Sequence, residues 1–205
     1  MNNLSSHAVY LIDDDLLVLS AVDSALQSYG YAPQTFSSAT DLLKVIDPSR
    51  TGVVITDLQM PKMDGVELQR KLMEQDCNLS LIFLTAHASV SVTVEVMKNG
   101  ATTLIEKPFN VEHLMEEVAK ALEASQNKQK ERARILVAIE RLAKLSAEEL
   151  AVMDLAANGK PNKVIGQELS LSNRTVDRRR QLALQKLNVN SIAEFAVLRE
   201  IAEKE

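Results

Sequence analysis

The stretch VVITDLQMP, Val53 to Pro61, decides the fold of this chain. Val53 to Thr56 have strand character, and the first three are uncharged and rich in β-branched side chains, as expected of a central parallel strand buried on both faces. Asp57 follows where this strand ends, and open α/β sheets bind ligands in the crevice outside the carboxyl ends of their strands. A single aspartate at such a place is usually a turn former, so a functional role depends on what the other strand ends carry.

Strand and helix patterns alternate through the first half of the chain. Strands are predicted at Ala8–Ile12, Ala32–Phe36, Val53–Thr56, Leu81–Leu84 and Thr103–Ile105. Helices are predicted at Leu16–Tyr29, Ala39–Ile46, Asp64–Gln75 and Ser89–Asn99. This alternation predicts an α/β fold, a doubly wound five-stranded parallel sheet with helices on both faces.

The segment SVSVTVEV, from Ser89 to Val96, conflicts locally with that scheme because its apolar residues alternate with a period of two. Two parallel strands need a crossover between them, which is usually helical. We therefore predict a helix, on which Val90, Val94 and Met97 form the buried stripe. Val92 and Val96 then form a second stripe that a monomer need not bury.

Polar and charged side chains follow four of the predicted strands: Asp13 and Asp14 the first, Asp57 the third, Thr85 the fourth and Lys107 the fifth. Because parallel strands end on a common edge, these groups can converge. Clustered carboxylates repel one another, and Mg²⁺, which takes oxygen ligands, would compensate them. Asp57 would then be a nucleophile toward a phosphoryl group, whose oxygens Lys107 and Thr85 could bind.

The acidic triplet has a simpler explanation as a solvated helix start, where aspartates favour the positive end of the helix dipole. That explanation accounts for Asp14 or Asp15. It leaves Thr85 and Lys107 without a role, so the convergent site is favoured.

Charge divides the chain into two halves. Residues 1–125 carry a net charge of −9 and residues 126–205 carry +4, together giving the −5 of the chain, which predicts two domains with different partners. Cys77 is the single cysteine of the 205 residues, which excludes a disulfide framework. The N-terminal segment lacks a signal-peptide pattern and no apolar run is long enough to span a bilayer, so a cytoplasmic location and no membrane partner are expected.

No glycine or proline occurs from Phe109 to Asn158, and the apolar spacing predicts helix on both sides of a polar middle. We interpret that middle, Ser125–Arg134, as a solvated connector. The apolar stripes that flank it could pair two chains as a short coiled coil.

The second half is predicted to contain four helices. Ser146 with Glu149 forms a capping box, and Ser191 with Glu194 repeats it before the last helix. Pro161 suits the first position of the second helix. A tight turn then leads to a third helix from Asn173 to about Leu187, and two short helices joined in this way are typical of a helix-turn-helix.

The third helix indicates the partner. The helix carries several arginines and too few acids to offset their charge. Such a concentration of positive charge is unfavourable unless an anion faces the helix. DNA phosphates supply that anion, and Arg and Gln can also read base edges in the major groove. The predicted DNA-binding residues are Lys163, Asn173, Arg174, Thr175, Arg178, Arg179, Gln181 and Lys186. A solvated basic face is the alternative, and three consecutive arginines make it the weaker one.

Residues 7–124 resemble the receiver domain of two-component response regulators, a flavodoxin-like fold. The resemblance rests on LIDDD (11–15), TDLQMP (56–61), the Asp64-Gly65 pair, FLTA (83–86) and EKPF (106–109), all in order. It implies that Asp57 accepts a phosphoryl group from a sensor histidine kinase. Receivers usually carry Tyr or Phe three residues before the lysine, and Leu104 stands here.

The same resemblance implies a magnesium site formed by Asp14, Asp57 and the backbone carbonyl of Gln59, with Asp13 holding metal-bound water. It also implies a cis peptide between Lys107 and Pro108. Such a protein is not a turnover enzyme, although it accepts a phosphoryl group and can dephosphorylate itself.

Residues 143–203 resemble the LuxR-type helix-turn-helix domain, through LSAEELAVMDLAANGKPNKVIGQELSLSNRTVDRRR and the following QKLNVNS. The whole chain is thus similar to FixJ-like response regulators of the NarL/LuxR class. This predicts a receiver at 1–124, a helical linker at 125–142 and a DNA-binding domain at 143–205. Family members commonly have histidine where Arg179 stands.

The resemblance implies a transcription regulator with a sensor histidine kinase, double-stranded DNA and RNA polymerase as partners. A homodimer on phosphorylation is expected through Val92, Val96 and Leu104, or alternatively along the Asn110–Leu145 helix. A phosphatase of the haloacid dehalogenase type is a second hypothesis, but its Asp-x-Asp-x-Thr motif lacks the threonine here. A receiver with a protein-interaction output is a third.

Overall fold

The computed structural model describes residues 7–87 and 89–204. The chain divides into two compact units, Met1–Gln129 and Lys130–Glu205. Within the described residues, no helix combines the length and the apolar character that crossing a bilayer would require.

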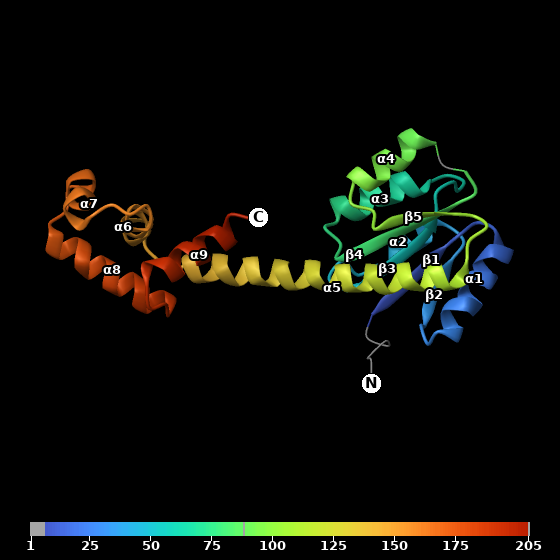
Figure 1. Cartoon of the computed structure of the whole chain (residues 1–205), viewed down its shortest axis with the longest axis horizontal. Helices are drawn as coiled ribbons and strands as arrows, with labels where there is room; N and C mark the ends of the chain where they lie inside the picture. Colours follow the sequence, from blue (N-terminus) through green and yellow to red (C-terminus); the bar gives the residue numbers. More distant parts are fainter. Residues whose placement is uncertain (1–6, 88, 205) are drawn as a thin grey trace. The chain divides into compact units, whose positions relative to one another are not determined.

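A five-stranded parallel sheet forms the centre of the first unit, as predicted (Figure 1). Its strands are β1 (Ala8–Ile12), β2 (Pro33–Phe36), β3 (Gly52–Asp57), β4 (Leu79–Thr85) and β5 (Thr103–Glu106). Their order across the sheet is β2-β1-β3-β4-β5, and each neighbouring pair is parallel. The strands that carry the predicted site residues are therefore adjacent, and β3 lies in the middle.

Helices cover both faces of this sheet. They are α1 (Leu16–Ser28), α2 (Ala39–Val45), α3 (Gly65–Glu74), α4 (Val90–Lys98) and α5 (Val111–Leu142). Side chains alternate along each strand, so Val54 packs with α2, α3 and α4, whereas its neighbours Val53 and Ile55 pack with α1 and α5. Both faces are apolar because both are covered by helices.

The orientation of α4 differs from the prediction. Val96 is fully buried and Val92 packs against the core of the first face, whereas Val90, Val94 and Met97 are 81%, 45% and 43% exposed. The two predicted stripes are thus exchanged. Valines occupy both of them, so apolar spacing alone could not tell which one faces the sheet.

The prediction of a solvated connector is wrong for the first turns of the segment. The segment belongs to one continuous helix, α5, and Ser125 is fully buried. The Ser125 hydroxyl accepts from the Gly52 N–H at 2.8 Å and donates to the Asn78 carbonyl. Lys128 then donates to the Cys77 carbonyl at 2.9 Å, so α5 is held against the strand-entry edge of the sheet.

The second unit contains the C-terminal part of α5 and four further helices, as predicted. These are α6 (Ala147–Ala157), α7 (Asn162–Leu169), α8 (Asn173–Leu187) and α9 (Ile192–Ala202). One core joins α5, α6, α8 and α9 around Met153 and Phe195, and a smaller one joins Val152, Ile165 and Val176.

The helix starts of this unit follow the predictions with two corrections. Ser146 and Glu149 form the reciprocal capping box. Pro161 is the N-cap of α7 and not its first helical residue. Ser191 caps α9, but the Glu194 carboxylate accepts from the Asn190 N–H, so the second capping box is displaced by one residue.

We expect Ser125→Ala to lower the free energy of unfolding by about 1–3 kcal/mol, because a buried donor and a buried acceptor would lose their partner. Urea denaturation of the full chain measures the loss. Ser24→Ala is the control, since the exposed Ser24 hydroxyl bonds only within its own helix. Equal stability of the two variants would contradict the role given to Ser125.

Candidate functional site

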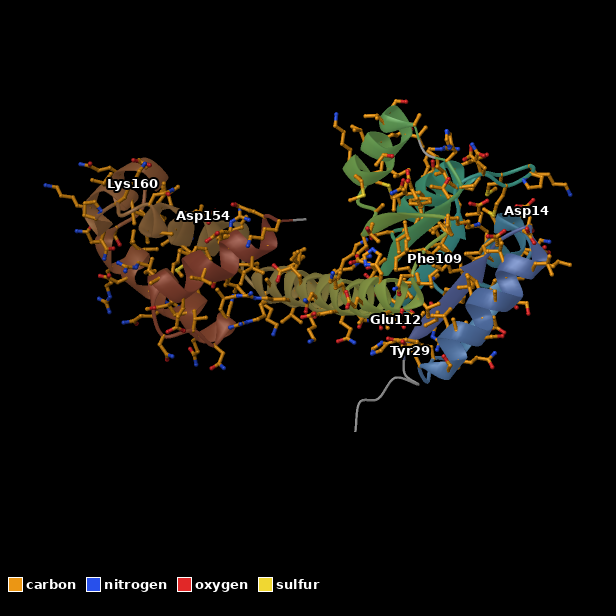
Figure 2. All side chains as sticks on the ribbon, turned by 45° about the vertical axis from the view of Figure 1, so that its right-hand side comes forward. Asp14, Tyr29, Phe109, Glu112, Asp154 and Lys160 are labelled. Atoms are coloured by element: carbon orange, nitrogen blue, oxygen red, sulfur yellow. The ribbon has the colours of Figure 1, made fainter. Side chains whose placement is uncertain are left out.

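Four adjacent strands deliver the predicted site residues to one edge of the sheet. Asp13 follows β1, Asp57 ends β3, Thr85 ends β4 and Lys107 follows β5. Asp14 lies beside them in the β1–α1 connection, just before the N-cap of α1, and Figure 2 labels it. One carboxylate oxygen from each of Asp13, Asp14 and Asp57 lies within 4.8 Å of the others, so the predicted cluster is formed.

Lys107 is the cation of this cluster. Its Nζ lies 2.7 Å from Asp13 Oδ2 and 3.5 Å from Asp57 Oδ1. Burial raises the pKa of the Asp57 carboxyl above its usual value, and Lys107 opposes that rise. The peptide bond between Lys107 and Pro108 is cis, as predicted.

The acidic triplet divides into two roles. The Asp15 carboxylate accepts from the Leu17 N–H at 2.8 Å and caps α1. The Asp15 N–H in turn donates to Asp13 Oδ1 at 2.9 Å. The helix-start explanation therefore holds for Asp15, while Asp13 and Asp14 belong to the cluster.

The Thr85 side chain is buried at the end of β4 and bonded away from the carboxylates. Its hydroxyl donates to the His87 carbonyl at 2.9 Å and accepts from the His87 N–H at 3.1 Å. Thr85 is thus held by the β4–α4 connection. A change in its partner would act directly on the segment that precedes α4.

Gly65 positions the site although it carries no functional group. Its N–H donates to the Leu58 carbonyl at 2.9 Å, and a Cβ on Gly65 would lie 2.7 Å from the Asp57 carbonyl oxygen. Only glycine allows α3 to begin this close to the end of β3. The Asp-Gly pair in the sequence is the signal for this contact.

The helix-turn-helix is formed by α7 and α8, joined through Ser170 in the left-handed conformation. The Leu171 N–H donates to the Gly166 carbonyl at 2.8 Å, and a Cβ on Gly166 would lie 2.6 Å from the Leu171 carbonyl oxygen. The Asn162 amide, at the start of α7, bonds Asp177 and Arg180 on α8. These contacts fix the two helices against each other.

The predicted DNA-binding residues separate into two groups. Most are exposed or half-buried on α7 and α8, with no carboxylate paired to Lys163, Arg174 or Arg178 among the residues the structure describes. Arg179 instead pairs with Glu148 of α6 at 2.8 Å, and Lys186 pairs with Glu149 at 2.7 Å.

The Glu149 carboxylate links the capping box to α8. It accepts from the Ser146 N–H at 2.9 Å and from Lys186 Nζ, and it is nearly buried. The hydrogen bond from Lys186, followed by that from the Ser146 backbone, lowers the pKa of Glu149 below its usual value. Lys186 therefore anchors α6 to α8. Figure 2 shows Asp154, which accepts from Arg199, further along α6.

Comparison with known proteins finds one family match in each half of the chain. Residues 9–119 match the response regulator receiver domain, and residues 143–199 match the bacterial regulatory proteins of the luxR family. The chain belongs to the response regulator family. This response regulator combines a receiver domain with a LuxR-type DNA-binding domain, and the phosphatase alternative has no support.

Relatives match over most of the chain. The transcriptional regulatory protein FixJ of Bradyrhizobium diazoefficiens is 31% identical over 93% of each chain. The response regulator protein TodT of Pseudomonas putida is 32% identical over 91% of this chain and 82% of its own. The structure of the response regulator StyR superposes with a TM-score of 0.79 at 31% identity, over 95% of this chain and 98% of that one.

We expect Lys186→Met to destabilise the second unit more strongly at neutral than at acidic pH. Glu149 has a lowered pKa in the folded state, so its stabilisation is present above its unfolded pKa and is lost as the pH falls through the folded pKa. Loss of its charged partner should cost about 1–3 kcal/mol at neutral pH.

Urea denaturation of the full chain at neutral and acidic pH measures this difference. Lys160→Met is the matched control, because Lys160 pairs with Glu168 at 2.7 Å in a more exposed position. An exposed pair should contribute about 0–1 kcal/mol. Equal losses in both variants at both pH values would refute the anchoring role.

Proposed function

We propose that this response regulator controls transcription through a phosphoryl group that a sensor histidine kinase transfers to Asp57. The observation that carries the proposal is the position of Lys107 Nζ, 3.5 Å from Asp57 and 2.7 Å from Asp13. At this edge, Lys107 can bind an oxygen of an incoming phosphoryl group while the Asp57 carboxylate attacks the phosphorus.

In the proposed transfer, an Asp57 carboxylate oxygen attacks the phosphorus of a phosphohistidine on the kinase. A P–O bond forms as the P–N bond breaks, and the histidine imidazole leaves. Lys107 offsets charge on the phosphoryl oxygens. The Thr85 hydroxyl exchanges its His87 partner for a phosphoryl oxygen. Hydrolysis of the acyl phosphate later restores the Asp57 carboxylate. We assign no other hydrolytic reaction to this protein.

The carboxylates fit a divalent cation. Three acids converge with Lys107 as the neighbouring cation, and carboxylate oxygens are ligands that Mg²⁺ prefers. We assign Asp14, Asp57 and the Gln59 carbonyl as ligands, with Asp13 binding a water of the hydration shell. When bound, the ion would neutralise charge that develops at the phosphorus.

DNA binding is assigned to the exposed surface of α7 and α8. Arg178 and Lys163 are suited to phosphates, whereas Arg174 and Gln181 are suited to base edges. Asn173 and Thr175, at the start of α8, complete the surface. A cytoplasmic location and contact with RNA polymerase belong to the same proposal, as functions of a transcription regulator.

A small phosphodonor with Mg²⁺ should add one labile phosphoryl group to the wild type and none to Asp57→Asn. Intact-mass analysis of the full chain detects the adduct. The same treatment should raise the affinity for genomic DNA fragments that the protein selects, and it should do so for the wild type and not for Asp57→Asn. Equal labelling of the two proteins would remove Asp57 from its assigned role, and unchanged DNA affinity would remove phosphorylation as the control.

Phosphorylation is also proposed to favour a homodimer through α4 and β5. The contact surface differs from the one expected from the sequence, because Val92 and Val96 face the core and Leu104 is partly buried against it. Val90 and Val94 are exposed instead, and an exposed apolar patch of this kind marks an interaction surface. Movement of Thr85 would reach this surface through the β4–α4 connection.

Val94→Glu should abolish the increase in dimer that the phosphodonor produces in the wild type. Sedimentation velocity of the full chain measures it. Val45→Glu is the matched control, since Val45 is 58% exposed on α2, which does not belong to the proposed contact. Dimerisation of Val94→Glu to the wild-type extent would place the contact elsewhere, such as along α5.

A further inference from the structure

The arginines of α8 differ in their partners, and the sequence does not show this difference. Arg178 and Arg179 are adjacent, yet only the second is paired with an acid among the described residues. Arg179 Nη2 lies 2.8 Å from Glu148 Oε2. This pair connects α8 to α6, 31 residues earlier in the chain.

The Glu148 carboxylate is stabilised by its helix. It lies in the first turn of α6, where a negative charge is stabilised by the positive end of the helix dipole. The Arg179 side chain is only 25% exposed, whereas that of Glu148 is 68% exposed. The guanidinium is therefore partly covered by protein and reaches solvent beside an exposed carboxylate.

Such a pair alters how α8 meets DNA. Each cation that neutralises a phosphate releases counterions and adds affinity that is independent of sequence. An arginine that already faces a carboxylate gains less from a phosphate, because it must first give up its own anion. Phosphate binding by α8 is then reduced, while base contacts by Arg174 and Gln181 are not.

We propose that Glu148 is a specificity-determining residue, which holds Arg179 in an intramolecular ion pair and withholds that cation from the DNA phosphates. The proposal rests on the proposed function of α8 in DNA binding. It assigns to Glu148 a role in lowering affinity for unrelated DNA. The ratio of specific to non-specific affinity is raised as a result.

Glu148→Gln should bind duplex DNA of mixed sequence several-fold more tightly at low salt. Its plot of log affinity against log salt concentration should be steeper than that of the wild type by about 0.9, the slope of one added phosphate contact. The wild type and Glu148→Gln are each treated with phosphodonor as full chains and titrated with DNA. The preference for bound genomic fragments over mixed-sequence DNA should fall.

The Arg179→Gln background separates two explanations for that result. If Glu148 acts by withholding Arg179, then Glu148→Gln has no effect on the salt slope when Arg179 is absent. The same steepening in both backgrounds would mean that Glu148 repels phosphates by itself, and this would overturn the proposal. So would a salt slope of Glu148→Gln equal to that of the wild type.

Two controls complete the test. Glu203→Gln removes the same charge from an exposed pair with Arg199 on α9, and it should leave the salt slope unchanged. A steeper slope in this variant would reduce the effect to net charge and overturn the proposal. Arg178→Ala should flatten the slope by about 0.9. An unchanged slope there, or no DNA binding by the wild type, would instead overturn the proposed function of α8.

Discussion

The receiver depends on an electrostatic constraint at one edge of its sheet. Asp13, Asp14 and Asp57 meet within a few ångströms, and Lys107 is the cation that contacts two of them. In water these carboxylates would repel one another and separate unless the backbone fixed their positions. The sheet does so because β1, β3, β4 and β5 are adjacent and parallel, so all their carboxyl ends share one edge. Burial at this edge, with the nearby charge of Asp13 as a smaller contribution, raises the pKa of Asp57, and Lys107 opposes the rise.

The same edge explains how a chemical event could be transmitted. Thr85 is held by the backbone of His87, in the connection that leads to α4. A hydroxyl with one proton donates to one acceptor at a time, so binding a phosphoryl oxygen means leaving the His87 carbonyl. Gln69 ties α4 to α3 by donating to the Val96 carbonyl at 2.9 Å. The helix is thus connected to the site at its start and fixed near its end.

The DNA-binding domain is organised differently, by ion pairs and hydrogen bonds that engage some of its many cations. Glu149 binds Lys186, Glu148 binds Arg179, and Asn162 bonds Asp177 and Arg180. These contacts serve the packing of α6 and α7 on α8. What remains for an external anion is a smaller set than the composition of α8 suggests, and it includes Arg174 and Arg178.

The sequence by itself determined the α/β order, the five strands, the four C-terminal helices and the residues that converge on Asp57. These features follow from local spacing and from the rule that parallel strands end on one edge, so neighbours in sequence carry enough information. The tertiary structure alone decided which valines of α4 face the core, because both stripes are apolar. It also decided that Ser125 is buried and that Arg179 is paired, since the partners of these residues, Gly52, Asn78 and Glu148, lie 31 or more residues away. Contacts over such separations depend on how the elements pack, which no local pattern records.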